Sequence, residues 1–443
     1  MSRPDVIDGS KRHTLFTWSA QAGLDPIEIV AAEGAHFTDG AGRRILDFAS
    51  LVLNATAAIR HPRIVDAIAR QAEALPAAGP AMATAIRARY GAALSAVVPG
   101  SLGKFLFTLG GADANEHAIK IARQVTGRAK IVTRYRSYHG ATSGALAATG
   151  DPRRLPFEPG LPGVVRVLDP YCYRCPFGWT PDICRRPCID HVEEVLRYEG
   201  PESVAAVLVE PVVGTNGGFW GPAEYLPRLR EICDRHGILL IFDEVLTGFG
   251  RTGRMFAFER FGAVPDVITM GKAITSGHAP LGAVAVSERI AAHFETRPLV
   301  TGTTHSAHPV SLAAALATLE VMRDEDLVGR ADRMDVVLAT GLAEIAARHP
   351  IVGDVRSLGL YGVIELVEDA ESRAPLVPWN GPPESQGPVK RLARGAYARG
   401  LHVATRWNYL FVAPPLCVAE ADLRWGLDVL DGLIGEIADG GGA

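Results

Sequence analysis

The chain has 443 residues, of which 48% are hydrophobic and 21% are charged, and its formal net charge is −4. A chain of this length can bury a large core, and we expect it to form two or more domains. It has no basic stripe for nucleic acid and no apolar run long enough to span a membrane. Residues 1–13 lack the apolar segment of a signal peptide, so we expect a cytoplasmic protein.

The first third of the chain predicts a short β-meander and then helices. Residues 14–50 carry aromatic side chains and a turn before ILDFAS, a pattern typical of short strands. Residues 61–98 are alanine-rich and helical in pattern. Next, KFLFTLGG at 104–111 predicts a strand that ends in glycine, and ADANEHAIKIAR predicts the helix that follows it. A strand, a glycine turn and a helix together form the geometry of a phosphate-binding site.

The middle of the chain predicts a largely parallel sheet. Its strand-like runs are nearly all apolar and alternate with helical segments, which is typical of a sheet covered on both faces. These runs cover residues 130–135, 204–212, 238–245, 266–270 and 282–287.

The last part of the chain predicts a long helix and a smaller α+β unit. Residues 311–349 are helical in pattern, and a strand, VRSLGLYGVIELV, and a helix, VKRLARGAYARG, follow on either side of a Pro-rich loop at 374–388. We therefore expect residues 61–325 to form a large domain, with residues 1–60 and 326–443 contributing to a small domain.

Lys272 is the candidate nucleophile. In DVITMGKAITSGHAPLG, the β-branched run Val267–Thr269 precedes the lysine, and Gly277 and Pro280 follow it, which predicts a strand that ends in a rigid loop. In open α/β sheets, the ligand crevice lies beyond the carboxyl ends of the strands. A partly desolvated lysine there loses proton affinity and can attack aldehydes. The alternative is an ordinary surface lysine.

Other residues could complete a site around Lys272. Asp243 ends an apolar strand, where a carboxylate is costly unless it meets a cation such as the protonated ring nitrogen of pyridoxal phosphate. A capping or salt-bridged aspartate is the alternative. The amides of Gly110, Gly111 and Ala112 precede a helix and could hold a phosphate. Tyr138 could stack on a flat cofactor or belong to the core.

The order and spacing of these residues resemble the class III, or omega, aminotransferases of pyridoxal-phosphate fold type I. The resemblance spans nearly the whole chain. It includes LDFAS, GGADANEHAIKIAR, YHGATSGA, EPVVGTNGG, FDEVLTGFGRTG, GKAITSGHAPLGAV, THSAHPVSLAAALA and APPL. It implies an α/β fold with a mostly parallel central sheet in a large domain, plus a smaller α+β domain. It also implies an enzyme that moves an amino group from a small-molecule amine donor to a 2-oxo acid acceptor.

The resemblance also implies roles for single residues. Lys272 would form the internal aldimine with the cofactor and move the proton, while Asp243 would pair with the ring nitrogen. Thr304 would reach the phosphate of the neighbouring subunit, so the active unit should be a homodimer with its active site at the interface. The other implied cofactor-binding residues are Gly111 and Ala112 at the phosphate, Tyr138 and Val245 at the ring faces, and Glu210 in EPVVGTNGG.

Departures from the family pattern bear on the substrate. Thr215 stands where amino-acid-specific members carry a glutamate, and Leu246 stands where many carry a glutamine. Phe411 replaces the carboxylate-binding arginine of ornithine-type relatives, which leaves Arg406 as the only guanidinium in HVATRWNYLFVAPPL. Arg406 is either a clamp for a carboxylate or sulfonate or a solvated surface arginine. Trp18 is the second candidate substrate residue.

These departures favour donors whose anionic group is distant or absent. We expect a primary amine or ω-amino acid such as taurine or β-alanine as donor, and pyruvate before 2-oxoglutarate as acceptor. A larger amine or ketone, such as a modified peptide, is an alternative substrate. A lyase or aminomutase is an alternative reaction, since one scaffold can host several fates of the same carbanion. The intact Lys272 and Asp243 argue against a non-catalytic cofactor-binding protein.

Four cysteines lie in one short segment, YCYRCPFGWTPDICRRPC. The segment resembles an insert found in a subset of these enzymes described as taurine or β-amino-acid aminotransferases. Its spacing allows two interpretations, a structural zinc site with four thiolate ligands or four reduced thiols in a loop. The candidate zinc ligands are Cys172, Cys175, Cys184 and Cys188.

Overall fold

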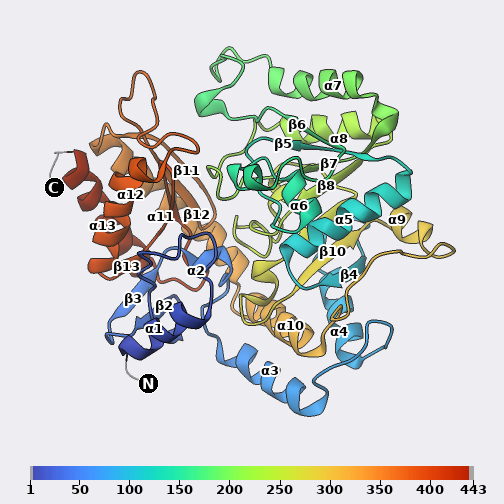
Figure 1. Ribbon diagram of the computed structural model, residues 1–443, viewed down its shortest axis with the longest axis horizontal. Helices are drawn as coiled ribbons and strands as arrows, with labels where there is room; N and C mark the ends of the chain where they lie inside the picture. The colour runs from blue at the N-terminus through green and yellow to red at the C-terminus, as the bar shows by residue number, and fades with distance from the viewer. Residues whose placement is uncertain (1–2, 439–443) are drawn as a thin grey trace.

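The computed structural model describes residues 3–438, which form a large central sheet and two smaller sheets surrounded by helices (Figure 1). The central sheet has seven strands in the order β4-β10-β9-β8-β7-β5-β6. The strands are β4 (Lys104–Thr108), β5 (Lys130–Arg134), β6 (Val164–Val167), β7 (Val204–Val209), β8 (Leu239–Asp243), β9 (Val267–Met270) and β10 (Gly282–Val286). The predicted α/β fold with a mostly parallel sheet is confirmed.

The central sheet is covered on both faces. Strands β6, β5, β7, β8 and β9 run parallel, whereas β10 is antiparallel to both of its neighbours. Alternate side chains enter two separate cores, as Val207 and Leu208 do. Helix α5 (Gly111–Thr126) packs on one face and α8 (Tyr225–His236) on the other. Burial on both faces explains the nearly continuous apolar sequence of these strands.

The first small sheet joins the two ends of the chain. Strands β1 (Ile29–Glu33), β2 (His36–Asp39) and β3 (Arg44–Asp47) form a meander, and β13 (Leu401–His402) pairs parallel to β3. Residues 14–28 contain no strand, so the meander begins later than the sequence pattern predicted.

The second small sheet has the order β11-β12-β15-β14. The sequence predicted one strand in VRSLGLYGVIELV, but β11 (Val352–Leu358) and β12 (Tyr361–Leu366) form a hairpin. Gly359 turns the chain between them with a φ of +59°, a conformation that favours glycine. Strands β14 (Ala404–Arg406) and β15 (Tyr409–Val412) complete the sheet.

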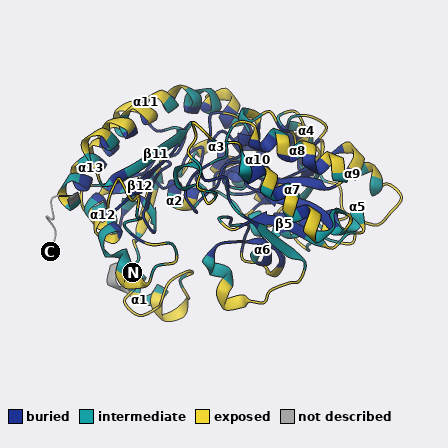
Figure 2. Cartoon of the chain, turned by 90° about the horizontal axis from the view of Figure 1, so that it is seen from above, coloured by how far each residue is buried: buried dark blue, intermediate teal, exposed yellow. Residues whose placement is uncertain are grey.

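The predicted long helix is in fact two helices. Helix α10 (Pro309–Asp324) is almost entirely buried, and α11 (Leu327–Arg348) begins after Asp326, whose φ is +47°. The outer faces of α11 and of α13 (Glu420–Ala438) are exposed (Figure 2). No helix among residues 3–438 combines the length and apolarity needed to cross a membrane. The other α-helices are α1 (Arg3–His13), α2 (Ser50–Leu53), α3 (Pro62–Ala74), α4 (Ala85–Ser95), α6 (Ser143–Ala148), α7 (Pro187–Glu199), α9 (Glu288–His293), α12 (Gly387–Ala398) and α13 (Glu420–Ala438).

Candidate active site

A cavity of about 410 Å³ lies where the chain leaves the carboxyl ends of the central strands. Asp243 ends β8, Glu210 follows β7, and Lys272 follows β9. Because neighbouring parallel strands end at the same edge of a sheet, residues far apart in sequence meet there. The predicted site residues that line the cavity are Trp18, Gly111, Ala112, Tyr138, Glu210, Thr215, Asp243, Val245, Leu246, Lys272, Arg406 and Phe411.

Lys272 is held in a strained turn just beyond β9. It begins the short 3-10 helix η5 (Lys272–Thr275), and its φ of +41° lies in a region that costs a non-glycine residue about 1–3 kcal/mol. Burial lowers the pKa of its amine, while the carboxylates of Asp243 and Glu210 act in the opposite direction. An amine that loses its proton more readily is a better nucleophile toward an aldehyde.

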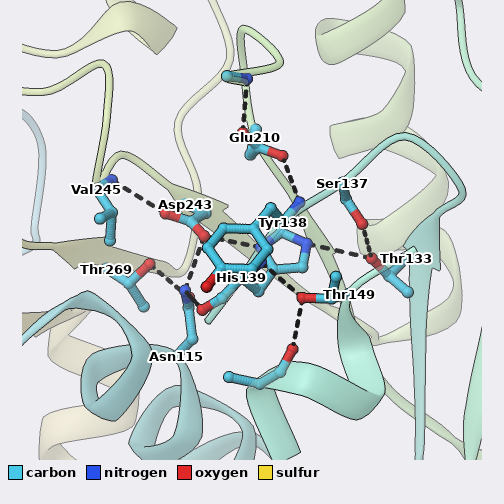
Figure 3. A network of polar contacts seen from close by, with 12 residues as sticks. Asn115, Thr133, Ser137, Tyr138, His139, Thr149, Glu210, Asp243, Val245 and Thr269 are labelled. Carbon is cyan, nitrogen blue, oxygen red and sulfur yellow. Dashed lines mark hydrogen bonds and ion pairs between the residues drawn. The ribbon is translucent and has the colours of Figure 1, made fainter. Parts of the chain in front are cut away.

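The Asp243 carboxylate is buried and accepts three hydrogen bonds (Figure 3). Its Oδ2 atom accepts from Asn115 Nδ2 and from His139 Nδ1, both at 2.7 Å, and its Oδ1 atom accepts from the Val245 amide at 3.0 Å. Hydrogen bonds from three donors fix the orientation of the carboxylate. The arrangement therefore presents a fixed negative charge to any cation in the cavity.

A second group of hydrogen bonds orients Asn115 and His139. Thr269 Oγ1 donates to Asn115 Oδ1 at 2.7 Å, and His139 Nε2 lies 3.2 Å from Thr133 Oγ1. Because an ionised carboxylate can only accept, the imidazole donates to Asp243 from Nδ1, which leaves Nε2 facing the Thr133 hydroxyl. Neither Asn115 nor His139 was predicted as a site residue, although both lie within the motifs that carry the family resemblance.

Glu210 ties together two loops of the cavity. Its Oε1 atom accepts from the Tyr138 amide at 3.1 Å, and its Oε2 atom accepts from the Gly214 amide at 2.7 Å. Burial raises the pKa of Glu210, and the Asp243 charge raises it further, whereas His139 lowers it. By accepting from the Tyr138 amide, the Glu210 carboxyl group fixes the backbone at Tyr138.

The start of α5 lies close to the turns that carry Val245 and Gly271. A Cβ atom on Gly111 would lie 2.5 Å from Val245 Cγ1, and a Cβ atom on Gly271 would lie 3.0 Å from the Gly111 nitrogen. Only glycine permits both approaches. The amides of Gly111 and Ala112 thus lie at the N-terminus of the 16-residue helix α5, at the cavity wall. The N-terminus of a helix stabilises an anionic group.

Two arginines share one buried carboxylate at the cavity wall. Arg153 Nε and Nη2 donate to Asp151 at 2.9 Å each, and Arg406 Nη2 donates to Asp151 Oδ2 at 2.6 Å. The Arg153 guanidinium also lies 3.6 Å from the centre of the Tyr138 ring. Two guanidiniums and one carboxylate leave one net positive charge. Asp151 and Arg153 were not predicted from the sequence, because DPRR is also an ordinary polar turn sequence.

The remaining predicted residues occupy different surroundings. Leu246 and Phe411 form apolar parts of the cavity wall, and Trp18 lines the cavity although 69% of its surface is exposed. Trp407, which follows Arg406 in the chain, is buried and lies against another tryptophan outside the lining, with the two ring planes tilted by 40°. Thr304 is exposed and does not line this cavity within its own chain.

The cysteine segment does not support the zinc interpretation. Among residues 3–438, no group of three or more His, Cys, Asp or Glu side chains is arranged to hold a metal ion. All four thiols are free, and burial raises the pKa of Cys172 and that of Cys188, the latter to about 12. Protonated thiols are poor metal ligands, because zinc binds the thiolate. The structure therefore shows reduced thiols at Cys172, Cys175, Cys184 and Cys188.

Comparisons with known proteins agree with this geometry. Residues 19–434 match the family described as aminotransferase class III. A taurine–pyruvate aminotransferase of Bilophila wadsworthia is 32% identical over 389 residues, 84% of this chain and 85% of that protein. A leucine/methionine racemase of Thermococcus litoralis is 33% identical over 99% of this chain and 97% of that protein. The crystal structure of a taurine:2-oxoglutarate aminotransferase from Bifidobacterium kashiwanohense, in complex with PLP and glutamate, has a TM-score of 0.95 and 35% identity over 99% of both chains.

Proposed function

We propose a donor class for this chain, which belongs to the class III aminotransferases and is therefore a pyridoxal-phosphate-dependent transaminase. Its donor carries a primary amine at one end and a single sulfonate or carboxylate at the other, as taurine and β-alanine do. Its acceptor is a small 2-oxo acid such as pyruvate. The sharing of Asp151 by Arg153 and Arg406 at the wall of the Lys272 cavity carries this proposal.

The cavity residues fit pyridoxal phosphate in each of its parts. When bound, the cofactor withdraws electrons from the carbon that bears the amino group. The Lys272 amine would bind its aldehyde, and once the donor amine has taken its place, the released Lys272 Nζ would move a proton from that carbon to the aldehyde carbon. The residues that would hold the cofactor are Asp243 at the ring nitrogen, Tyr138 and Val245 at the ring, Gly111 and Ala112 at the phosphate, and Glu210 behind Tyr138.

The charge at the cavity wall supports a donor with one anionic group. Asp151 neutralises one of the two guanidiniums, so a single sulfonate or carboxylate balances the charge that remains. A planar guanidinium can bind such a group through two hydrogen bonds. Leu246 and Phe411 offer no further cation, which supports pyruvate rather than the dicarboxylate 2-oxoglutarate. The cavity volume of about 410 Å³ also favours a small donor over a modified peptide.

We also propose that the enzyme is a homodimer whose active site lies at the subunit interface. Thr304 is exposed and lies outside the Lys272 cavity of its own chain, which fits the proposed role at the phosphate of the neighbouring subunit. Trp18 and Val52 line the cavity with large exposed surfaces, 69% and 61%, as expected if a second chain covers them.

A donor panel on wild type and Arg406→Ala tests the donor class. Losing a hydrogen bond to a charged group costs about 1.5–3 kcal/mol, so taurine and β-alanine should lose about tenfold or more in kcat/KM. Propylamine, which has no anionic group, should be nearly unaffected. Arg424→Ala is the matched control, because Arg424 forms only an exposed pair with Glu420. Consumption of one 2-oxo acid per donor separates transamination from racemase, lyase or aminomutase chemistry on this scaffold.

Equal losses for anionic donors and propylamine would contradict the proposed role of Arg406. A preference for propylamine in the wild type would contradict the donor class itself.

A further inference from the structure

Two tryptophans stack beside Arg406, outside the lining of the active-site cavity. The Trp379 and Trp407 rings have centres 4.0 Å apart and planes tilted by 40°. Trp379 comes from the Pro-rich loop 374–388, and Trp407 lies in the turn between β14 and β15. The two segments meet although neither tryptophan touches the cavity.

Each tryptophan also packs against an arginine. Arg406 Cζ lies 4.1 Å from the centre of the Trp407 ring, and Arg136 Cζ lies 4.3 Å from the centre of the Trp379 ring. The Trp379 ring and the Arg406 guanidinium both lie about 4 Å from the centre of the Trp407 ring, and they would overlap if they lay on the same face. They therefore cover opposite faces of Trp407. By the same argument, Trp407 and Arg136 cover opposite faces of Trp379. Arg136, Trp379, Trp407 and Arg406 therefore form one continuous series, which we call the tryptophan stack.

The tryptophan stack constrains Arg406 where hydrogen bonds do not. Among residues 3–438, the Arg406 guanidinium donates to Asp151 through Nη2 alone, and its buried Nε atom has no hydrogen-bond partner. One hydrogen bond leaves the guanidinium plane free to rotate about the bonded nitrogen. The Trp407 ring, whose centre lies 4.1 Å from Arg406 Cζ, limits that rotation, because the attraction of a cation to an aromatic face depends on its position over the ring.

Trp407 itself depends on Trp379. Its φ of +48° lies in the left-handed region, which is costly for a bulky residue and persists only where the surroundings hold it. The Trp379 ring covers the face of Trp407 that Arg406 leaves free. On the other side, Arg136 lies between the Trp379 and Tyr171 rings and donates from Nη1 to the Tyr409 hydroxyl at 2.9 Å. Trp379 therefore cannot move without disturbing several contacts.

We propose that Trp379 is a positioning residue for donor selection, which holds Arg406 through Trp407 in the orientation that receives the anionic group of the donor. This inference rests on the proposed function of Arg406. It assigns to the Pro-rich loop 374–388 a role in specificity, although the loop supplies no residue to the cavity lining.

Trp379→Leu tests the inference, because leucine fills part of the space but has no aromatic face. We expect taurine to lose about three- to tenfold in kcat/KM through a higher KM, with kcat for propylamine unchanged. Trp379→Phe should restore most of the loss. Isethionate, which has the sulfonate but no amine, should bind the holoenzyme of Trp379→Leu more weakly by the same factor in calorimetry. Trp220→Leu is the control, since Trp220 is also partly buried against the main core but lies outside the tryptophan stack.

The background variant Arg406→Ala separates the possible failures. In that background, Trp379→Leu should have no further effect on the ratio of taurine to propylamine. Suppose that wild type and Arg406→Ala behave as proposed, but Trp379→Leu keeps the wild-type ratio of taurine to propylamine and the wild-type affinity for isethionate. This inference is then wrong, while the proposed function stands. If Arg406→Ala itself spares taurine, the proposed function is wrong, and the inference is wrong with it. A loss in Trp379→Phe as large as in Trp379→Leu would also overturn the role of the aromatic face.

Discussion

The His139 ring donates a hydrogen bond from Nδ1 to the Asp243 carboxylate over 2.7 Å, and both side chains are buried. The other ring nitrogen faces the Thr133 hydroxyl at 3.2 Å, so the ring is held at both ends. Asp243 thereby keeps a fixed orientation at the end of β8, facing the cavity that contains Lys272. The orientation of Asp243 therefore depends on neighbouring side chains that hold its carboxylate.

The His139–Asp243 contact predicts a graded loss of turnover. His139→Ala removes one hydrogen bond to a charged group, so kcat should fall about 10- to 100-fold. His139→Asn keeps an N–H donor and should lose less. Cofactor absorbance measured alongside turnover shows whether the loss comes from chemistry or from cofactor binding. If both variants turn over at the wild-type rate, the contact does not support Asp243 in catalysis.

Arg153 and Arg406 are predicted to act as a pair. Arg153→Ala removes the group over Tyr138 and should lower kcat/KM for taurine by about tenfold or more. Combined with Arg406→Ala, it leaves the Asp151 carboxylate without a cation, so the cavity wall becomes negative. The double variant should then accept propylamine at least as well as the wild type while rejecting taurine. Simple additivity of the two losses would show that the arginines act independently.

Glu244 predicts a pH-dependent stability unrelated to turnover. Burial raises its pKa from about 4.5 to about 7, with hydrogen bonds from Thr247 and from the Phe258 and Ala257 amides acting against this. Between these two pH values the folded state binds more protons than the unfolded state, so the free energy of unfolding falls as pH rises. The fall attributable to this group is on the order of 3 kcal/mol.

Glu244→Gln should remove that part of the pH dependence. In the wild type, the Thr247 hydroxyl and the Phe258 amide both donate to Glu244. A glutamine can still accept from the Phe258 amide through its oxygen, and its amide nitrogen can donate to the Thr247 hydroxyl. Urea unfolding of both proteins between pH 5 and pH 8 measures the difference. Parallel stability curves for wild type and variant would contradict a raised pKa.

The features that the sequence predicted are those that depend on residues close together in the chain. The central strands and the glycine turn before α5 follow from local patterns, and Lys272 and Asp243 follow from their positions at strand ends. The pairing of Arg406 with Asp151 joins residues 255 positions apart, and no local pattern predicts it. Arg153 was missed because DPRR, the sequence that contains it, is also typical of an ordinary polar turn.

The smaller elements show the same limit. The two-residue strand β13 forms only because β3 lies beside it, and its own sequence carries no strand signal. The loop at 374–388 was predicted from its prolines, but its contact with Trp407 depends on the three-dimensional fold. The cysteine spacing allowed a zinc site, and only the arrangement of the thiols argues against it.

Subunit mixing tests whether Thr304 acts in the neighbouring active site. Lys272→Ala and Thr304→Trp should each be nearly inactive alone, the first without its amine and the second with a blocked phosphate site. Heterodimers of the two contain one active site with neither change if Thr304 acts across the interface. Mixing after reversible dissociation should then restore up to about half of wild-type activity per mixed dimer, since one of its two sites is intact. Absence of any recovery in verified heterodimers would mean that Thr304 acts within its own chain.

The central claim is that the Lys272 amine binds the cofactor and carries out proton transfer. Borohydride converts a reversible linkage between lysine and an aldehyde into a stable one, so peptide mass spectrometry of the reduced holoenzyme measures the attachment site directly. We predict a phosphopyridoxyl group on the peptide that contains Lys272, and its loss together with amino transfer in Lys272→Ala. The same group on another lysine, with amino transfer preserved in Lys272→Ala, would contradict the account.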